Sequence, residues 1–241
     1  MRLALLRRFG VIAALLIAAP LRAAPGGIAV SPLRLDMAAA RPTAALTAAN
    51  SDAAAHRFQI ELLRWTQPGG RDHYEATDAL IANPPLFELA PGAQQVVRVG
   101  LLDVPAGSDE QAFRLYLTEI PRASEPPASQ LNFMLRLGVP LFVAPQGAVR
   151  RSWRWSARLD GQTYVLRADN DGNVHQRRAG LRLFDADRQI EIGHDAGFRD
   201  VLPGAYSEWR FAAAPPLARR LRISATTDAG ADDSTIPLAT P

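Results

Sequence analysis

The chain has 241 residues, a formal net charge of +3 and no cysteine. Arginine supplies every basic side chain, because the sequence contains no lysine, and these arginines are spread along the chain, whereas nucleic-acid binding requires a concentrated basic face. The absence of cysteine excludes thiolate metal sites, redox pairs and a catalytic cysteine, and leaves burial of an ordinary core to stabilise the fold.

The first 23 residues have the pattern of a secretory signal peptide. A basic start with three arginines precedes the apolar stretch 9–21, and the small residues Ala23 and Ala24 follow. The apolar stretch is shorter than the roughly 20 residues that a membrane-spanning helix needs. We therefore expect residues 1–23 to be removed on export. Four arginines leave with this segment, which takes the formal charge from +3 to −1.

The remaining sequence consists of short alternating segments separated by turns rich in proline and glycine. This spacing is typical of β-sandwiches. The alanine-rich segment 38–49 is also expected to be a strand, because Pro42 and its threonines fit a strand as well as a helix. The other expected strands are 27–35, 56–65, 94–101, 112–120, 131–143, 163–168, 179–184, 208–211 and 221–226.

A break falls at Pro145-Gln146-Gly147, between two halves that are both rich in predicted strands. Proline and glycine in a polar stretch of this kind indicate a linker. The sequence therefore predicts an all-β protein with a signal peptide at 1–23, an N-terminal domain at 24–146 and a C-terminal domain at 147–241.

The segment 131–143 has the longest regular alternation in the chain. Every odd position is apolar, in the order Leu, Phe, Leu, Leu, Val, Leu, Val. One face of such a strand is wholly apolar over more than the usual strand length. The segment fits two interpretations: a long core strand, or an exposed edge that is lent to a partner as an added strand.

The residues that most often carry chemistry form no recognisable constellation. His56, His73, His175 and His194 lack metal-ligand spacing and are expected to be surface or satisfied side chains. Glu110 and Glu119 have no obvious acid–base partner. The segment 169–173 faintly resembles a calcium loop but lacks the distal glutamate, so a tight hairpin turn is the preferred interpretation. No nucleophile elbow, zinc-protease motif or phosphate loop is present. We therefore expect no enzyme activity, metal, cofactor or small-molecule substrate.

Five segments in a fixed order carry a resemblance to a known family. They include a first strand with an arginine, a strand-ending asparagine and a strand that ends in Glu-Ile-Pro. They are Ile28–Arg34, Asn50, Asn83–Val99, Phe113–Pro121 and Leu131–Pro145. In this order and spacing the chain resembles the periplasmic chaperones of chaperone–usher pilus assembly, over nearly all of the mature sequence.

The resemblance implies two immunoglobulin-like domains in a boomerang arrangement and a periplasmic location. A pilus subunit that lacks its C-terminal strand would receive alternate side chains of a donor strand into its groove. The subunit would then be delivered to an outer-membrane usher, and pairing between free molecules through their donor strands is left open. The implied subunit-binding side chains are Leu131, Phe133, Leu135 and Leu137.

One departure from the family pattern concerns the anchor for the subunit's C-terminal carboxylate. Many members use an arginine on the first strand, which Arg34 matches, and a lysine late in the donor strand. Pro140 occupies the lysine position here. Because arginine suits a bidentate carboxylate contact, Arg98 and Arg114 are the candidates to assist or replace Arg34; the alternative for each is a structural ion pair. The departure resembles the more divergent branches that build thin pili.

Two other functional classes are compatible with an exported all-β protein. The chain could be a structural pilus subunit or adhesin, but a subunit usually has one incomplete domain and an exposed N-terminal extension. An exported hydrolase on a β-sandwich is disfavoured because no catalytic constellation is present.

Overall fold

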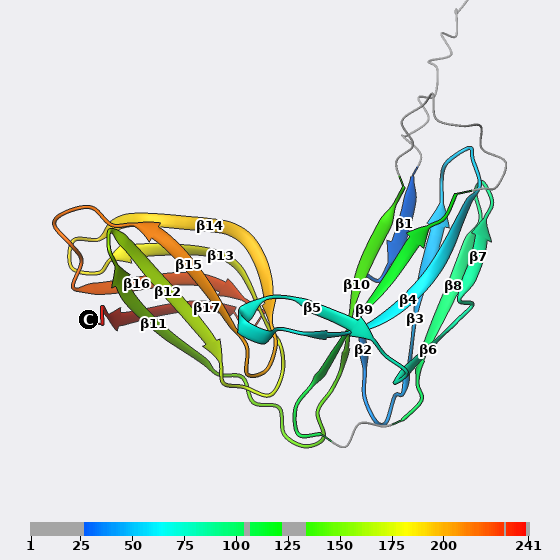
Figure 1. The fold of residues 1–241 in the computed structure, drawn as a ribbon, viewed down its shortest axis with the longest axis horizontal. Coiled ribbons are helices and arrows are strands. Elements are labelled where there is room, and N and C mark those ends of the chain that lie inside the picture. Colours follow the sequence, from blue (N-terminus) through cyan, green and yellow to red (C-terminus); the bar gives the residue numbers. More distant parts are fainter. Residues whose placement is uncertain (1–26, 104–106, 122–133, 229, 240–241) are drawn as a thin grey trace, which may run out of the picture.

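The computed structural model describes residues 27–103, 107–121, 134–228 and 230–239, most of which lie in strands. The strands build two β-sandwiches that meet at an angle and give the molecule the outline of a boomerang (Figure 1). The single helical element in these ranges is the 3-10 turn η1 (Pro68–Gly70). No helix among the described residues is long and apolar enough to cross a membrane. The expected all-β fold with two sandwich domains is confirmed.

The first sandwich packs a four-stranded sheet, in the order β1-β3-β8-β6, against a six-stranded sheet. The larger sheet has the order β2-β10-β9-β4-β5, with β7 also paired to β4. Alternate apolar side chains of both sheets fill one core, as the period of two in a strand requires. The strands are β1 (Ile28–Ser31), β2 (Leu35–Met37), β3 (Thr43–Asn50), β4 (His56–Thr66), β5 (His73–Ala76), β6 (Leu80–Asn83), β7 (Leu86–Leu89), β8 (Gln94–Leu101), β9 (Gln111–Glu119) and β10 (Arg136–Val143).

The second sandwich packs a three-stranded sheet, in the order β11-β12-β15, against a four-stranded sheet, in the order β14-β13-β16-β17. Its core is separate from the first one and includes Leu166, Leu183 and Ile223. The two sandwiches thus each have their own hydrophobic centre, as independent domains do. The strands are β11 (Trp153–Asp160), β12 (Thr163–Asn170), β13 (Gln176–Asp185), β14 (Ile190–Val201), β15 (Tyr206–Ala212), β16 (Arg220–Thr227) and β17 (Gly230–Pro237).

The predicted first strand, 27–35, is wrong as a single element, because the chain changes sheets within it. β1 pairs antiparallel with β3 in the smaller sheet. β2 then pairs parallel with the last residues of β10 in the larger sheet. Pro32 lies between the two strands and has no N–H group to continue a ladder, so the crossover falls where pairing is interrupted in any case.

The segment 169–173 is not the predicted hairpin turn, because β12 and β13 lie in different sheets. Asn170 is fully buried where the chain crosses between them. Its side-chain N–H groups donate to the carbonyls of Val174 (2.9 Å) and Val201 (2.8 Å). Its oxygen accepts from the Gly172 amide (3.0 Å) and the Gln176 side chain (2.7 Å). Both the nitrogen and the oxygen of the Asn170 carboxamide are thus hydrogen-bonded within the connection between the two sheets. In the first sandwich, Asn50 ends β3 in a comparable role.

Replacing Asn170 by alanine is expected to lower the free energy of unfolding by about 2–4 kcal/mol, because several buried backbone groups lose their partners at once. Chemical denaturation of the parent and the variant measures this difference. Asn83→Ala, at an exposed position in β6, is the matched control and should change the value by less than about 0.5 kcal/mol. Equal effects of the two substitutions would contradict the role given to the Asn170 network.

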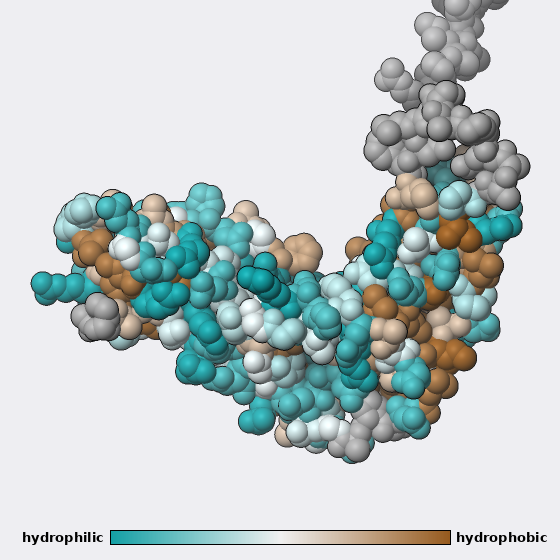
Figure 2. Space-filling model, viewed as in Figure 1, coloured by the Kyte–Doolittle hydropathy of each residue, from teal (hydrophilic) through white to brown (hydrophobic). Residues whose placement is uncertain are grey.

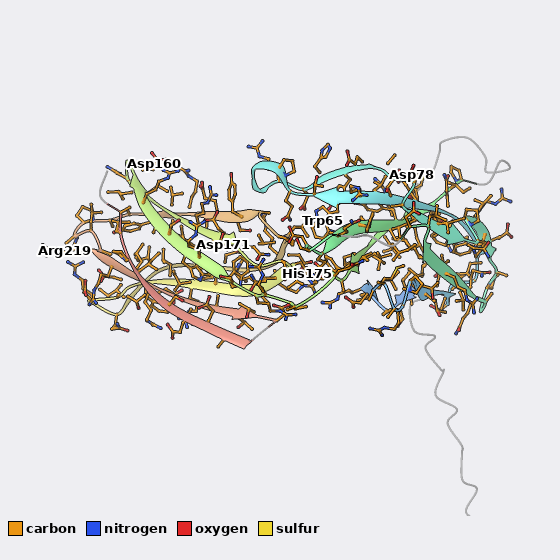
Figure 3. All side chains as sticks on the ribbon, turned by 90° about the horizontal axis from the view of Figure 1, so that it is seen from below. Trp65, Asp78, Asp160, Asp171, His175 and Arg219 are labelled. Carbon is orange, nitrogen blue, oxygen red and sulfur yellow. The ribbon has the colours of Figure 1, made fainter. Side chains whose placement is uncertain are left out.

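A third apolar cluster joins the two sandwiches and includes Trp65, Phe142 and Leu202. Phe142 of β10 stacks on His175, with ring centroids 3.6 Å apart and an interplanar angle of 6°. The buried His175 ring donates from Nδ1 to Glu110 at 2.6 Å. Trp65 and His175 both lie where the two sandwiches meet (Figure 3). The relative position of the domains is therefore fixed by packed and hydrogen-bonded side chains and not only by the linker.

The β4–β5 hairpin adds a second connection between the domains, because it reaches across to the second sandwich (Figure 1). The Gln67 side chain donates to the Asp200 carbonyl (2.9 Å) and accepts from the Leu202 amide (2.9 Å). Gly70 has φ +72°, and a Cβ atom there would lie 2.8 Å from the Tyr206 carbonyl oxygen. Glycine is therefore required at the tip of this hairpin both by its backbone conformation and by the close approach.

Candidate functional site

Strand β10 has an open edge over part of its length. It pairs with β9 along all of its residues, from Arg136 to Val143. On its other side, β2 covers only Leu141–Val143. Among the described residues, the ladder groups on this side of 136–140 therefore have no partner strand. Such an edge is a template for pairing with another chain.

The apolar side chains of β10 become less buried from the end of the strand toward its beginning. Val139, Leu141 and Val143 are buried in the first core, whereas Leu135 and Leu137 are only partly buried against it. The backbone of Leu135 is held by Glu119, whose amide donates to the Leu135 carbonyl at 2.8 Å. The predicted residues Leu131 and Phe133 lie outside the described part of the chain. Leu135 and Leu137 are therefore the predicted binding side chains that can be placed, at the rim of the sandwich.

The opposite face of β10 turns toward the second sandwich and carries a layer of aromatic rings and guanidinium groups. Arg136 lies over the Tyr116 ring at 3.9 Å from its centroid. A Cβ atom on Gly138 would come within 2.8 Å of that ring. Glycine at this position therefore lets Tyr116 lie across the strand.

Arg34 lies at the end of the open edge that is nearest to Pro140. Leu35 pairs with Leu141, so Arg34 is next to Pro140. Its Nε is 3.0 Å from both carboxylate oxygens of Asp36, and its Nη1 is 3.5 Å from Nε2 of His175. Arg34 is not in a strand but in the bend between β1 and β2, and it already has one carboxylate partner.

Arg114 reaches the same region from β9, where it is paired with Pro140. Its guanidinium lies over the Trp65 ring at 4.3 Å and donates to the Tyr74 hydroxyl at 3.2 Å. Its Nε is buried without a hydrogen-bond partner, and no carboxylate of the described residues lies within salt-bridge distance. Burial raises the pKa of Tyr74, while the charge and hydrogen bond of Arg114 oppose that shift. Among the described residues, the hydrogen-bond partner of Arg114 is therefore a hydroxyl and not a carboxylate.

Arg98 lies elsewhere. It belongs to β8 in the smaller sheet, where its neighbours Val97 and Val99 point into the core. Because side chains alternate along a strand, Arg98 points outward, away from the sheet that contains β10. The structure brings Arg34 and Arg114 together beside Pro140 and does not bring Arg98 to them.

A cleft of about 500 Å³ opens beside this edge, between the two sandwiches. In the space-filling view the molecule is hollowed on the concave side of the boomerang, between its two limbs (Figure 2). Both domains line the cleft. The first contributes Leu33, Trp65, Asp72, Arg114, Gly138 and Pro140, and the second contributes Arg177, Phe198, Arg199 and Asp200.

The arrangement of an open strand edge above an interdomain cleft can be compared with known proteins. The sequence profile of the family described as pili and flagellar-assembly chaperone, PapD N-terminal domain, matches residues 27–149. The chain belongs to this family. The family match confirms the resemblance to pilus-assembly chaperones that the sequence indicated. No curated protein matches the chain in sequence.

Solved structures of pilus chaperones share the fold of this chaperone over both domains. The CsuC–CsuE chaperone–tip adhesion subunit complex from archaic chaperone–usher Csu pili of Acinetobacter baumannii contains a chain with 20% identity and a TM-score of 0.66; the match covers 88% of this chain and 98% of that one. The SafA pilin–SafB chaperone complex of Salmonella enterica gives 18% identity, a TM-score of 0.60, and coverages of 88% and 96%. The CupB2 chaperone of Pseudomonas aeruginosa gives 17% identity, a TM-score of 0.56, and coverages of 88% and 100%. The similarity to these structures supports the two-domain immunoglobulin-like fold.

Sequence reasoning missed the partners of two acidic residues of this chaperone. Glu110 bonds to His175 and Glu119 bonds to His56, both at 2.6 Å. The paired residues are 65 and 63 positions apart in the chain. No local pattern marks such pairs. Glu110 lies two residues before the predicted strand 112–120 and Glu119 lies one residue before its end, so a position near a strand end was the available signal.

Proposed function

We propose that this protein is a periplasmic chaperone that stabilises pilus subunits by lending them the open edge of β10 and delivers them to an outer-membrane usher. The observation that carries the proposal is the uncovered ladder at 136–140, with Leu135 and Leu137 at the rim of the sandwich. Secretion through the signal pattern at 1–23 would place the chaperone in the periplasm. The family and fold are those of binding proteins, and no catalytic role is proposed.

The proposed donor strand comprises residues 131–135 and the first residues of β10. Its alternate side chains Leu131, Phe133, Leu135 and Leu137 would enter the groove of a subunit that lacks a strand. Burial of three or four large apolar side chains contributes on the order of 6–10 kcal/mol before ordering costs. Main-chain hydrogen bonds add to this, and the alternation fixes the register. This is enough to hold an otherwise unstable subunit.

The end of the bound subunit strand would be held by Arg34 and Arg114. Both lie beside Pro140, where the open edge stops. A terminal carboxylate there would accept from the guanidinium of Arg114, which lines the cleft and donates to the neutral Tyr74 hydroxyl. Arg34 would contribute by sharing its charge between Asp36 and the ligand.

Co-expression with a pilus subunit in a bacterial periplasm tests the proposal. The yield of soluble subunit should depend on this protein and fall sharply with Leu135→Arg, because the charge would have to enter the apolar groove of the subunit. Ile190→Arg, at an exposed apolar position on β14, is the matched control and should leave the yield unchanged. Circular dichroism of both variants shows whether they are folded.

Two outcomes would reject donation through this edge. The subunit could be equally soluble without the protein, or the folded Leu135→Arg variant could protect it as well as the parent does. The alternative from the sequence, a structural pilus subunit, requires a sandwich that lacks a strand. The two-domain fold shared with solved chaperones gives no support to that alternative.

A further inference from the structure

The second sandwich presents a large exposed aromatic side chain to the cleft. Phe198 of β14 is 71% exposed, although a side chain of this size is normally removed from water. Its ring is positioned by Arg177, whose guanidinium lies 5.4 Å from the ring centroid. Arg177 is itself fixed by two hydrogen bonds to Asp200, at 2.7 and 2.9 Å. The Phe198 ring therefore lines the cleft beside Arg177, whose position is fixed by Asp200.

The first sandwich presents an equally exposed apolar side chain to the same cleft. Leu33 is 75% exposed and lines the cleft together with Phe198. Gly138 also lines the cleft, and the Tyr116 ring occupies the space where a side chain would lie. The cleft thus offers an apolar surface from both domains beside the open edge of β10.

The cleft lining contains three arginines and two aspartates, so its formal charge is +1. Asp200 is engaged by Arg177, and Asp72 accepts from the Trp65 and Gln67 side chains. Among the described residues, no carboxylate lies within salt-bridge distance of Arg114 or Arg199. An occupant of complementary chemistry therefore carries a negative charge next to an apolar side chain. The carboxyl end of an extended polypeptide that has an apolar residue at or next to its terminus satisfies both conditions.

The register of an added strand puts such a side chain in reach of Phe198. A strand on the open edge of β10 turns alternate side chains toward the rim of the first sandwich, as Leu135 and Leu137 do. The intervening side chains lie on the face of Gly138 and Pro140, which is the face that lines the cleft. They project toward the second sandwich.

We propose that Phe198, supported by Arg177, is a specificity element on the second domain that recognises an apolar, cleft-facing side chain next to the carboxyl terminus of the bound subunit. This inference rests on the proposed function, because it assumes that a subunit strand pairs with β10. Phe198 would add a preference for an apolar side chain near the carboxyl terminus of the subunit. The open edge of β10 and the carboxylate anchor do not supply that preference by themselves.

Three synthetic peptides test this inference on the mature protein. They share one extended sequence with a free terminal carboxylate and carry phenylalanine at the last position, phenylalanine at the second-to-last position, or serine at both. Fluorescence anisotropy of labelled peptides gives each Kd. The parent protein should bind one phenylalanine peptide roughly tenfold more tightly than the serine peptide. Phe198→Ser should abolish that preference and leave the serine peptide's Kd unchanged.

Ile190→Ser removes another exposed apolar side chain from the same strand and should keep the preference. If Phe198→Ser retains the tenfold preference, or if the parent has none while still binding the serine peptide, the role of Phe198 is rejected and the proposed function stands. If neither parent nor variant binds any of the peptides, strand pairing at β10 is rejected together with this inference.

Discussion

Replacing Arg114 by alanine is expected to weaken the complex with a pilus subunit by roughly 10- to 100-fold. A charge-assisted hydrogen bond contributes about 1.5–3 kcal/mol, and each 1.4 kcal/mol changes Kd about tenfold. Arg114 has no carboxylate partner of its own within the described part of the chain, so a bound terminal carboxylate gains the full contact. Titration of the purified chaperone with a peptide from a subunit's carboxyl terminus measures the effect.

The other two candidate arginines provide internal comparisons. Arg34→Ala should have a smaller effect than Arg114→Ala, because Arg34 already bonds to Asp36. Arg98→Ala removes the same charge from the outer face of the smaller sheet and should leave Kd within twofold. If Arg98→Ala weakened binding as much as Arg114→Ala, the loss would reflect the overall charge of the protein and the anchor beside Pro140 would be rejected.

Replacing Phe142 by alanine is expected to separate the unfolding of the two sandwiches. Phe142 is almost fully buried, belongs to the interdomain cluster and stacks on His175. Its removal should cost about 3–5 kcal/mol of stability. Because the lost contacts join the domains, differential scanning calorimetry should resolve two transitions where the parent has one, or two transitions that are further apart than in the parent.

Phe58→Ala is the control for this result. Phe58 is as deeply buried as Phe142 but belongs to the core of the first sandwich. Its loss should lower the transition of that domain by a comparable amount and leave the transition of the second domain in place. An identical response to both substitutions would mean that the stack on His175 does not couple the domains.

The first domain could be read from the sequence to a large extent, because its strands alternate cleanly. The predicted strands 94–101 and 112–120 agree with β8 and β9 to within a residue. The apolar odd positions of β10 face the core as the alternation predicts, from Val139 to Val143. Period-two patterns of this kind depend only on burial of one face, which is a local property of the sequence.

The second domain was harder to predict, because its edge strand β14 has no clean alternation. Most of its residues are exposed, and bulges shift the register of its pairing with β13. The interdomain contacts were not predicted at all. Phe142 looked like an ordinary strand residue, and its stacking on His175 depends on how the chain crosses between the domains.

The sequence also left part of the candidate site open, because long-range strand pairing leaves no local pattern. The sequence identified the strand with the open edge and an arginine at its end, but it could not choose between Arg98 and Arg114. Both are single arginines within alternating strands. They differ in which of the two sheets their strand joins, and that is decided by long-range pairing.

The short parallel pairing of β2 with Leu141–Val143 limits how far any added strand can extend along β10. The free ladder groups run out at Pro140, so an added strand that slid further would collide with the protein's own Leu35. A strand that stopped one residue early would turn every side chain to the opposite face. In the proposed complex, β2 would therefore act as an end stop. The position at which a partner chain terminates would then be sensed whatever sequence that chain carries.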